Sequence, residues 1–366
     1  MVMDKPDTND TKPEKVQVTV AEAKPREKVV LSSDKDALKR INLVAVAHSH
    51  VERDMFPTQE AYEAEFEVEE RAREVVEEIK KLGVNAKAYP GDQYLLTNLL
   101  VDKPDFVLNL VDTLKGKDSL QTSVPAALEL SNIPYTGAGM EGLVIGNNRN
   151  LVKHLLVSYQ IDTPDFQFIR RVGTQVDDSL GLPLIVKLNE SGGSVGINNK
   201  AVQETLKDAQ KKVDDMIGTY KIPVIVERFI DGREITAVVY DDGTKNHVFL
   251  GEKVFRNKVD GRHYFTSFES YDDPHGAYRY KSVDEPLASK IAPLVVRAFN
   301  GLSNKDYAKF DIRVDEKGTP YFTDCNPNTA FGPDKGLPFT EVLTLNDISF
   351  TDVLVSLLTK YAKLLA

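Results

Sequence analysis

The chain has 366 residues, which predicts two to three domains at about 150 residues each. Hydrophobic residues make up 41% of it, enough for each domain to bury a core. Its 46 Lys and Arg residues stand against 56 Asp and Glu residues, a net charge of −10, so we expect small-molecule or protein partners, with no nucleic acid and no membrane. The single cysteine, Cys325, excludes an internal disulfide. No apolar run reaches the ~18 residues of a membrane helix, and the N-terminus lacks a signal-peptide core, so we expect a soluble, cytoplasmic protein.

Residues 1–37 hold eight acidic and seven basic residues, three prolines and no aromatic residue. They bury too little apolar surface to offset the entropy of ordering, and we predict a disordered tail. The apolar run 41–47 then predicts a buried parallel strand. Apolar residues at three- and four-residue spacing predict a helix that ends at Gly83, namely Tyr62, Phe66, Ala72, Val75, Val76, Ile79 and Leu82.

Two further strands, at 86–89 and 106–111, and a helical segment at 122–130 continue this alternation. It predicts an open, mostly parallel α/β domain over residues 38–145.

After Gly146 the pattern becomes α+β, and we predict a central domain (146–230) and a C-terminal domain (231–366). Helices are expected at 150–159, 202–220, 285–300 and 347–365. Strands are expected at 166–170, 182–188, 224–229, 234–240, 246–254, 308–314 and 319–326.

Two glycine motifs point to different structures. The segment from Gly137 to Gly142 fits G-x-G-x-x-G, but it comes late in its domain and no acidic residue ends a following strand, so a turn before a helix is favoured over a dinucleotide site. The glycine loop, residues 190–196, follows a strand that carries Lys187 near its end. Its paired glycines let backbone N–H groups approach phosphate oxygens, with Lys187 as a nearby charge. A flexible hairpin tip with an exposed lysine is the alternative.

The segment 224–234 joins a buried strand to a short apolar turn and a second acid. It fits a purine slot between two domains, with Glu227 accepting from the exocyclic amine and Glu234 binding the ribose hydroxyls. A strand that ends in a surface salt bridge is the alternative interpretation.

The segment 307–326 reads as a β-hairpin. If 315–318 form the turn, Val314 faces Thr319 and Lys309 lies opposite Asp324. The alternation of side chains then gathers five polar residues on one face, namely Lys309, Asp311, Arg313, Asp324 and Asn326.

Two carboxylates and an amide on this face are the hard oxygen ligands that Mg²⁺ prefers. A surface ladder of opposite charges also produces such alternation, but it does not account for the Asp-x-Asn-x-Asn string that begins at Asp324.

The order of four motifs resembles the ATP-grasp superfamily and, within it, the D-alanine–D-alanine ligase-like carboxylate–amine ligases. The motifs are the Ile133-Pro-Tyr-Thr-Gly segment, the segment from Lys187 to Gly196, the hinge 227–234 and the final hairpin. The resemblance implies an ATP-grasp fold of mixed α/β and α+β type, with nucleotide held between the central and C-terminal domains. It also implies ATP and Mg²⁺ as cofactors and a carboxylate and an amine as small-molecule substrates, and it is compatible with a homodimer. ATP would phosphorylate the carboxylate, and the amine would attack the acylphosphate and release phosphate.

Carried over by position, the resemblance implies three groups of site residues. The nucleotide-binding group is Lys153, Lys187, Gly192, Gly193, Ser194, Glu227, Arg228, Ile230 and Glu234. The metal ligands are Asp311, Asp324 and Asn326. The catalytic group is Lys309, Arg313, Arg279, Tyr280 and Glu52.

The departures from the family pattern concern the substrate side. Lys309 stands where the family has an arginine that steadies the transferring phosphoryl group, and Arg313 on the same face is its expected substitute. Gly193 stands where these ligases have a serine, and Asp324 replaces a glutamate. We therefore expect ATP-dependent ligation of amino-acid or dipeptide-type substrates rather than dedicated D-alanine–D-alanine ligation. A phosphotransferase without ligation and a nucleotide-binding module that has lost catalysis are the alternatives.

Overall fold

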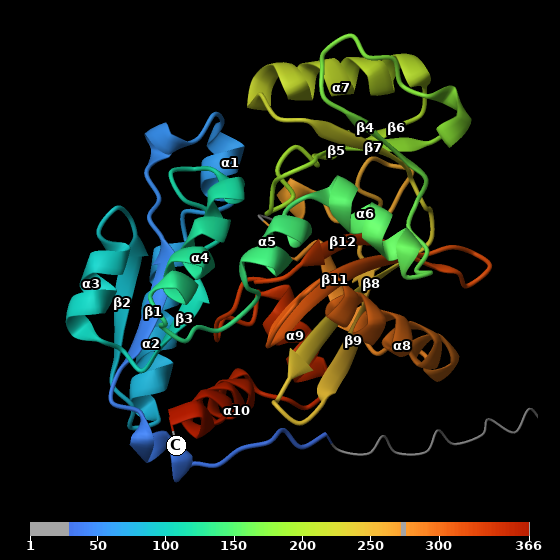
Figure 1. Ribbon diagram of the computed structural model, residues 1–366. Helices are drawn as coiled ribbons and strands as arrows, with labels where there is room; N and C mark the ends of the chain where they lie inside the picture. The colour runs from blue at the N-terminus through green and yellow to red at the C-terminus, as the bar shows by residue number, and fades with distance from the viewer. Residues whose placement is uncertain (1–28, 272–275, 366) are drawn as a thin grey trace, which may run out of the picture. The chain divides into compact units, whose positions relative to one another are not determined.

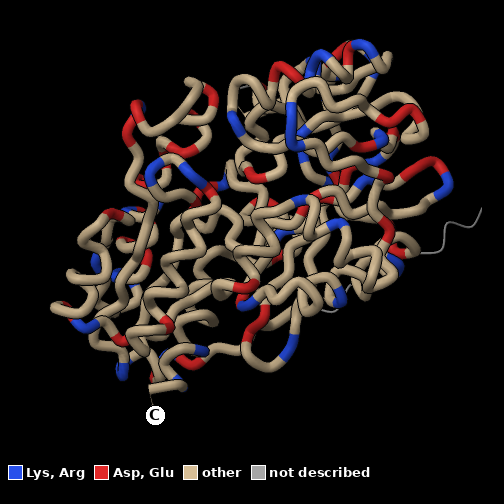
Figure 2. The backbone as a smooth tube through the Cα atoms, turned by 45° about the horizontal axis from the view of Figure 1, so that its top comes forward, with Lys and Arg blue, Asp and Glu red and all other residues tan. Residues whose placement is uncertain are grey.

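The computed structural model describes residues 29–271 and 276–365. From Leu31 onward the chain forms one compact unit. Within it, three β-sheets follow one another along the sequence (Figure 1). Lys and Arg residues are interspersed with Asp and Glu residues along the backbone, and neither sign fills one side of the view in Figure 2.

The first sheet is parallel, with strand order β2-β1-β3. Its strands are β1 (Val44–Ser49), β2 (Ala86–Gly91) and β3 (Phe106–Leu110). Every residue of β1 is buried, as the continuous apolar run predicted. The surrounding helices are α2 (Val68–Lys81), α3 (Leu95–Asp102), α4 (Ser123–Leu130) and α5 (Met140–Gly146). The segment Gly137–Gly142 turns into α5, with Gly139 as its N-cap, as the favoured interpretation required.

The second sheet is antiparallel, with order β4-β7-β5-β6. Its strands are β4 (Phe166–Ile169), β5 (Leu184–Leu188), β6 (Val202–Gln203) and β7 (Val224–Arg228). The amphipathic helix α7 (Leu206–Tyr220) covers this sheet with its apolar face (Figure 1). The sheet therefore presents its other face, with Lys187 and Glu227, toward the rest of the unit.

The third sheet is antiparallel, with order β10-β9-β8-β11-β12. Its strands are β8 (Arg233–Asp241), β9 (Asn246–Phe255), β10 (Tyr278–Lys281), β11 (Tyr307–Val314) and β12 (Pro320–Asn326). The helices that accompany it are α6 (Arg149–Ser158), α8 (Glu285–Gly301), α9 (Pro338–Leu345) and α10 (Phe350–Ala362).

The boundary predicted at residue 146 assigns α6 to the central domain, and its packing argues against this. Val152 and Leu156 of α6 share one hydrophobic core with Phe310 and Phe322 of the third sheet. The chain thus contributes a helix to the C-terminal sheet before it enters the second sheet, because the apolar stripe of α6 matches that sheet's inner face.

The single helix predicted up to Gly83 is wrong, because the structure divides it into α1 (Gln59–Glu63) and α2. The two pieces serve different cores. Ala61 and Ala64 pack against the core under the second sheet, whereas α2 packs on β1 and β2. One straight helix could not direct its apolar stripe toward both of these cores.

Of the predicted tail, residues 1–28 lie outside the described residues. Its predicted end at residue 37 is too late, because Leu31 and Ala37 are buried. The Asp34 backbone N–H also donates to Thr359 Oγ1 of α10 at 3.0 Å.

Among the described residues, no single helix combines the length and hydropathy needed to span a bilayer. The segments Pro338–Leu345 and Phe350–Leu365 meet those criteria only together, across a bend of 102°.

Candidate active site

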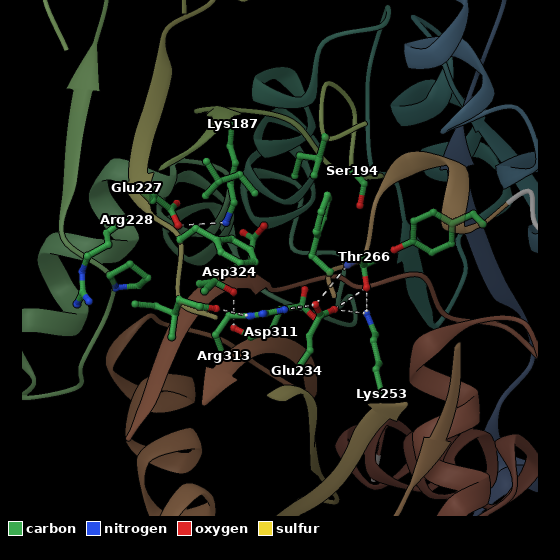
Figure 3. A pocket seen from close by; sticks show the side chains of 18 residues that line it. Lys187, Ser194, Glu227, Arg228, Glu234, Lys253, Thr266, Asp311, Arg313 and Asp324 are labelled. Carbon is green, nitrogen blue, oxygen red and sulfur yellow. Dashed lines mark hydrogen bonds and ion pairs between the residues drawn. The ribbon is translucent and has the colours of Figure 1, made fainter. Parts of the chain in front are cut away.

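A pocket lies where the second and third sheets face each other, and ten of its charged and polar side chains are labelled in Figure 3. It is lined by Pro164, Ile185, Lys187, Ser194, Ile197, Glu227, Arg228, Phe229, Ile230, Glu234, Lys253, Phe265, Thr266, Tyr271, Asp311, Arg313, Thr323 and Asp324. Nine of the residues predicted from the sequence are therefore brought together, although they span almost 140 positions of the chain.

Glu227, the next-to-last residue of β7 in the second sheet, is buried between two lysines. Its carboxylate lies 3.1 Å from Lys187 Nζ and 3.3 Å from Lys153 Nζ. Burial alone would raise the pKa of Glu227, but the two ammonium groups outweigh burial and hold the pKa below its usual value. The alternative of a surface salt bridge at the end of this strand is excluded, since Glu227 is only 1% exposed.

Lys153 lies behind Glu227 and does not line the pocket itself. It is 1% exposed, donates to Thr163 Oγ1 at 2.8 Å, and burial lowers its pKa to about 8 despite the attraction of Glu227. In this structure it acts on the pocket through Glu227, while Lys187 lines the pocket directly. Arg228 and Ile230 line the pocket on either side of Phe229.

Glu234, the predicted ribose ligand, is held by a set of donors from the third sheet. It accepts from Lys253 Nζ at 2.9 Å, from Arg313 Nη1 at 2.9 Å and from Thr266 Oγ1 at 2.5 Å (Figure 3). Burial opposes ionisation, but Lys253 and Arg313 outweigh it and lower the pKa of Glu234 to about 2. The carboxylate is thus ionised and fixed in orientation.

Lys253 is a site residue that the sequence analysis missed. It lies in the interior of β9, where a single lysine in an apolar strand carries no motif. Only its register in the sheet, opposite Glu234, reveals the contact.

Arg313 does share the face of Lys309 and Asp311, but it does not stand free as the substitute for the family arginine. Its Nε donates to the Ile230 carbonyl at 2.9 Å, and its Nη1 donates to Glu234 and to the Tyr264 carbonyl at 2.8 Å. The guanidinium also lies over the Phe229 ring. These contacts hold the Arg313 side chain against the hinge although it lines the pocket, and its catalytic role stays a prediction.

The hairpin forms with a register different from the one predicted. Asp311 lies opposite Asp324 and Lys309 opposite Asn326, and Val314 pairs with Pro320. A bulge between Asp311 and Ile312 shifts the pairing. The predicted pairing of Lys309 with Asp324 is therefore wrong, yet the shift brings the two carboxylates face to face.

The two carboxylates fit a divalent cation. Asp311 Oδ1 is buried and has no hydrogen-bond partner in the described chain, while its Oδ2 accepts from Lys309 Nζ at 2.5 Å. Asp324 accepts from Arg149 Nη2 at 2.7 Å, and the Asn326 amide lies 3.4 Å from Asp311. No group of three or more His, Cys, Asp or Glu side chains in the described residues is placed to hold a metal by itself. Two carboxylates and one amide would thus need other oxygen ligands, such as phosphates, to complete a Mg²⁺ shell.

The glycine loop stands at the rim of the pocket, and only its Ser194 lines it. Gly192 N–H donates to Asp118 Oδ2 at 3.0 Å and Gly196 N–H to Glu60 Oε1 at 2.8 Å, so both donors are occupied by the N-terminal part of the unit. The N–H groups of Gly193 and Ser194 have no acceptor within the described residues. In the described residues the N–H groups of Glu190 and Ser191 have none either, so four loop donors remain for an anion.

Three predicted catalytic residues lie outside the pocket. Glu52 is exposed and pairs with His50 at 3.2 Å, and the Arg279 side chain is exposed on β10. Tyr280 is directed into the sheet, where its hydroxyl lies 3.0 Å from Thr236 Oγ1 and burial raises its pKa well above the usual value. None of the three lines the pocket.

Sequence and fold comparisons relate the chain to known ligases. The family model described as D-ala D-ala ligase C-terminus matches residues 155–359, more than half of the chain. The chain is 29% identical to a D-alanine–D-alanine ligase of Polaromonas naphthalenivorans over 69% of its length and 77% of that protein. It is 26% identical to the uncharacterized protein y4sG of Sinorhizobium fredii over 70% of its length and 77% of that protein. A crystal structure of D-alanine–D-alanine ligase from Bacillus anthracis complexed with ATP superposes with a TM-score of 0.66 at 18% identity, over 88% of this chain and 98% of that one.

The chain belongs to the D-alanine–D-alanine ligase family. The predicted ATP-grasp fold and the predicted activity class, an ATP-dependent carboxylate–amine ligase, are confirmed.

Proposed function

We propose that this ligase joins an amino-acid carboxylate to an amine at the pocket between the second and third sheets. The supporting observation is the arrangement of Lys187 and Glu227 on one wall and Asp311 and Asp324 on the other. Relatives that bear the name D-alanine–D-alanine ligase make amino acids the first substrates to test.

In this proposal, different side chains of the pocket bind the phosphates, the ribose and the base of the nucleotide. Lys187 holds the phosphates from the second sheet, assisted by the N–H groups of Gly193 and Ser194. Glu234, fixed by Lys253 and Arg313, receives the ribose hydroxyls, and the apolar side chains of Ile185 and Ile230 contact the base.

Asp311, Asp324 and Asn326 would hold Mg²⁺, which neutralises charge on a transferring phosphoryl group when it is bound. Arg149 fixes the Asp324 carboxylate, and Lys309 fixes that of Asp311. The glycine loop, tied to Asp118 and Glu60, excludes water from the acylphosphate, which water would otherwise hydrolyse. A homodimer and a cytoplasmic location stay predictions.

The test is ADP and phosphate release with pairs of amino acids, followed by mass spectrometry of the product. A ligase forms a condensed product only when both substrates are present, whereas a phosphotransferase releases ADP at full rate without the amine.

We expect Lys187→Ala to abolish ADP formation. Lys200→Ala, which changes an exposed lysine, should leave ADP formation unchanged. Undiminished ADP formation by Lys187→Ala would contradict the site.

A further inference from the structure

The carboxylate of Glu234 already has a donor at every acceptor position. A carboxylate offers about four lone-pair directions, two on each oxygen. Oε1 accepts from Lys253 Nζ at 2.9 Å and from Thr266 Oγ1 at 2.5 Å. Oε2 accepts from Arg313 Nη1 at 2.9 Å and from the Thr266 backbone N–H at 3.3 Å. A ribose hydroxyl can therefore donate to Glu234 only if it displaces one of these donors.

The Thr266 hydroxyl makes the two bonds that a ribose hydroxyl would make at this position. It donates to Glu234 Oε1 and accepts from Lys253 Nζ at 2.7 Å (Figure 3). A ribose hydroxyl has the same single donor and the same acceptor lone pairs. All three side chains line the pocket. Exchange of one hydroxyl for the other would thus keep the carboxylate and the ammonium group paired.

The two charged donors of Glu234 are poor candidates for displacement. Lys253 and Arg313 are buried, and they belong to strands β9 and β11 of the third sheet. Moving either one away would leave a buried charge without its partner, which is strongly destabilising. Lys253 Nζ also lies over the Tyr278 ring, 4.7 Å from its centroid. Thr266 is neutral, and it lies in the segment 256–267, which forms neither helix nor strand.

The neighbours of Thr266 are held by the second sheet and its loops. Phe265 packs in one hydrophobic cluster with Ile185 and Ile197. The Phe268 N–H donates to the Ile197 carbonyl at 2.8 Å, and the Ser267 hydroxyl lies 3.0 Å from Asn199 Oδ1. These contacts do not involve Glu234 or Lys253, so Thr266 can turn away from the third sheet while its neighbours stay in place.

We propose that Thr266 holds the position of a ribose hydroxyl before nucleotide binds, and that binding exchanges the one hydroxyl for the other. The inference rests on the proposed function, which places the ribose at Glu234, and it adds Lys253 as the donor to the ribose oxygen. A sugar without that hydroxyl displaces Thr266 but does not restore the two bonds. The exchange therefore makes the enzyme selective for ribonucleotides.

The first test compares the affinities of ATP, 2′-deoxy-ATP and 3′-deoxy-ATP, measured by calorimetry in the presence of Mg²⁺. We expect at least one deoxynucleotide to bind tenfold or more weakly than ATP, and the weaker one identifies the hydroxyl. Lys253→Met keeps the apolar stem but removes the donor, so it should reduce this ratio at least threefold. Lys258→Met changes an exposed lysine near the same segment and should leave the ratio unchanged. Equal affinities for the unmutated protein, or an unchanged ratio in Lys253→Met, would overturn the proposal.

The second test uses the sign of an effect. Thr266→Ala removes the competing hydroxyl, so the affinity for ATP should rise at least threefold. Thr266→Ser keeps a hydroxyl and should change the affinity less. If Thr266 served only the fold, or bound nucleotide directly, the alanine variant would bind ATP equally or more weakly, and either result overturns the exchange. These measurements need no turnover. If the protein binds ATP but forms no condensed product, the proposed ligation fails and the affinities still decide the exchange.

Discussion

At the scale of single residues, the pocket is built from charged groups that restrain one another before any ligand binds. Asp311 and Asp324 each have a cation on one oxygen, Lys309 and Arg149 respectively. Glu234 is fixed by Lys253 and Arg313. Such preorganisation lowers the reorganisation needed when a charged nucleotide enters.

The first prediction separates the chemistry of Asp324 from its structural pairing. Asp324→Asn keeps an acceptor for Arg149 and should retain most of the stability while ADP formation falls by about 100-fold or more, because a carboxylate ligand is lost. Asp324→Ala leaves a buried guanidinium without its partner and should also lower the free energy of unfolding by about 3 kcal/mol. Glu316→Gln, at the exposed hairpin turn, is the control. Full activity in Asp324→Asn would remove Asp324 from the metal site.

The second prediction concerns acid stability. The pKa of Glu234 is about 2 in the folded protein against 4.5 for an ordinary glutamate. Because the folded value is the lower one, its stabilising contribution is complete above about pH 4.5 and is lost as the pH falls toward 2. That shift corresponds to about 3 kcal/mol at neutral pH. Glu234→Gln should thus show a flatter fall of unfolding free energy between pH 5 and pH 3 in urea titrations. Identical slopes for the two proteins would contradict the buried pairing.

At the scale of elements, the glycine loop packs directly against α1 and the residue that follows it. The loop hydrogen bonds to Glu60, and a Cβ on Gly193 would come within 2.7 Å of the Ala64 Cβ. Gly193 also has φ +59, a conformation that costs other residues about 1 kcal/mol or more. The close approach of α1 and the positive φ together explain why a glycine stands at position 193.

The third prediction follows from this contact. Gly193→Ala should displace the loop, raise the KM for ATP several-fold and lower the melting temperature. Adding Ala64→Gly removes the steric clash but not the backbone strain, so it should recover part of the loss in KM. The comparison is a double-mutant cycle on KM and melting temperature. Strictly additive effects would show that the loop does not close against α1.

Some parts of the pocket could be predicted from the sequence and others could not. The hinge, the glycine loop and the hairpin are local patterns, and the family resemblance carried by their order implied nine of the residues that line the pocket. The bulge at Asp311 could not be predicted, because register depends on pairing with both β8 and β12. Lys253 was missed for a similar reason, because only the register of β9 against β8 places it opposite Glu234.

At the scale of the whole molecule, described as one unit from Leu31 onward, residues near the start of that unit contact its C-terminal helix α10. Phe106 of β3 stacks on Tyr361 of α10, and the Tyr361 hydroxyl donates to Asp306 at 2.8 Å. Leu31 and the following residues lie against α10 and the β8–β9 turn. The C-terminal helix is thus held by residues from the start of the unit and by β3.

The last prediction tests these contacts by truncation. A chain that begins at residue 38 loses the buried Leu31 and the bonds from the Ser32 and Asp34 backbone N–H groups to Asp242 and Thr359. Burial of one leucine is worth about 2 kcal/mol, and in a unit of this size that corresponds to a fall of roughly 3 °C or more in melting temperature. A chain that begins at residue 29 keeps all these contacts and is the reference. Because the pocket residues are untouched, the KM for ATP should be the same in both chains. Equal melting temperatures would mean that these residues contribute nothing to the fold, and a raised KM would mean that the loss of these contacts reaches the active site.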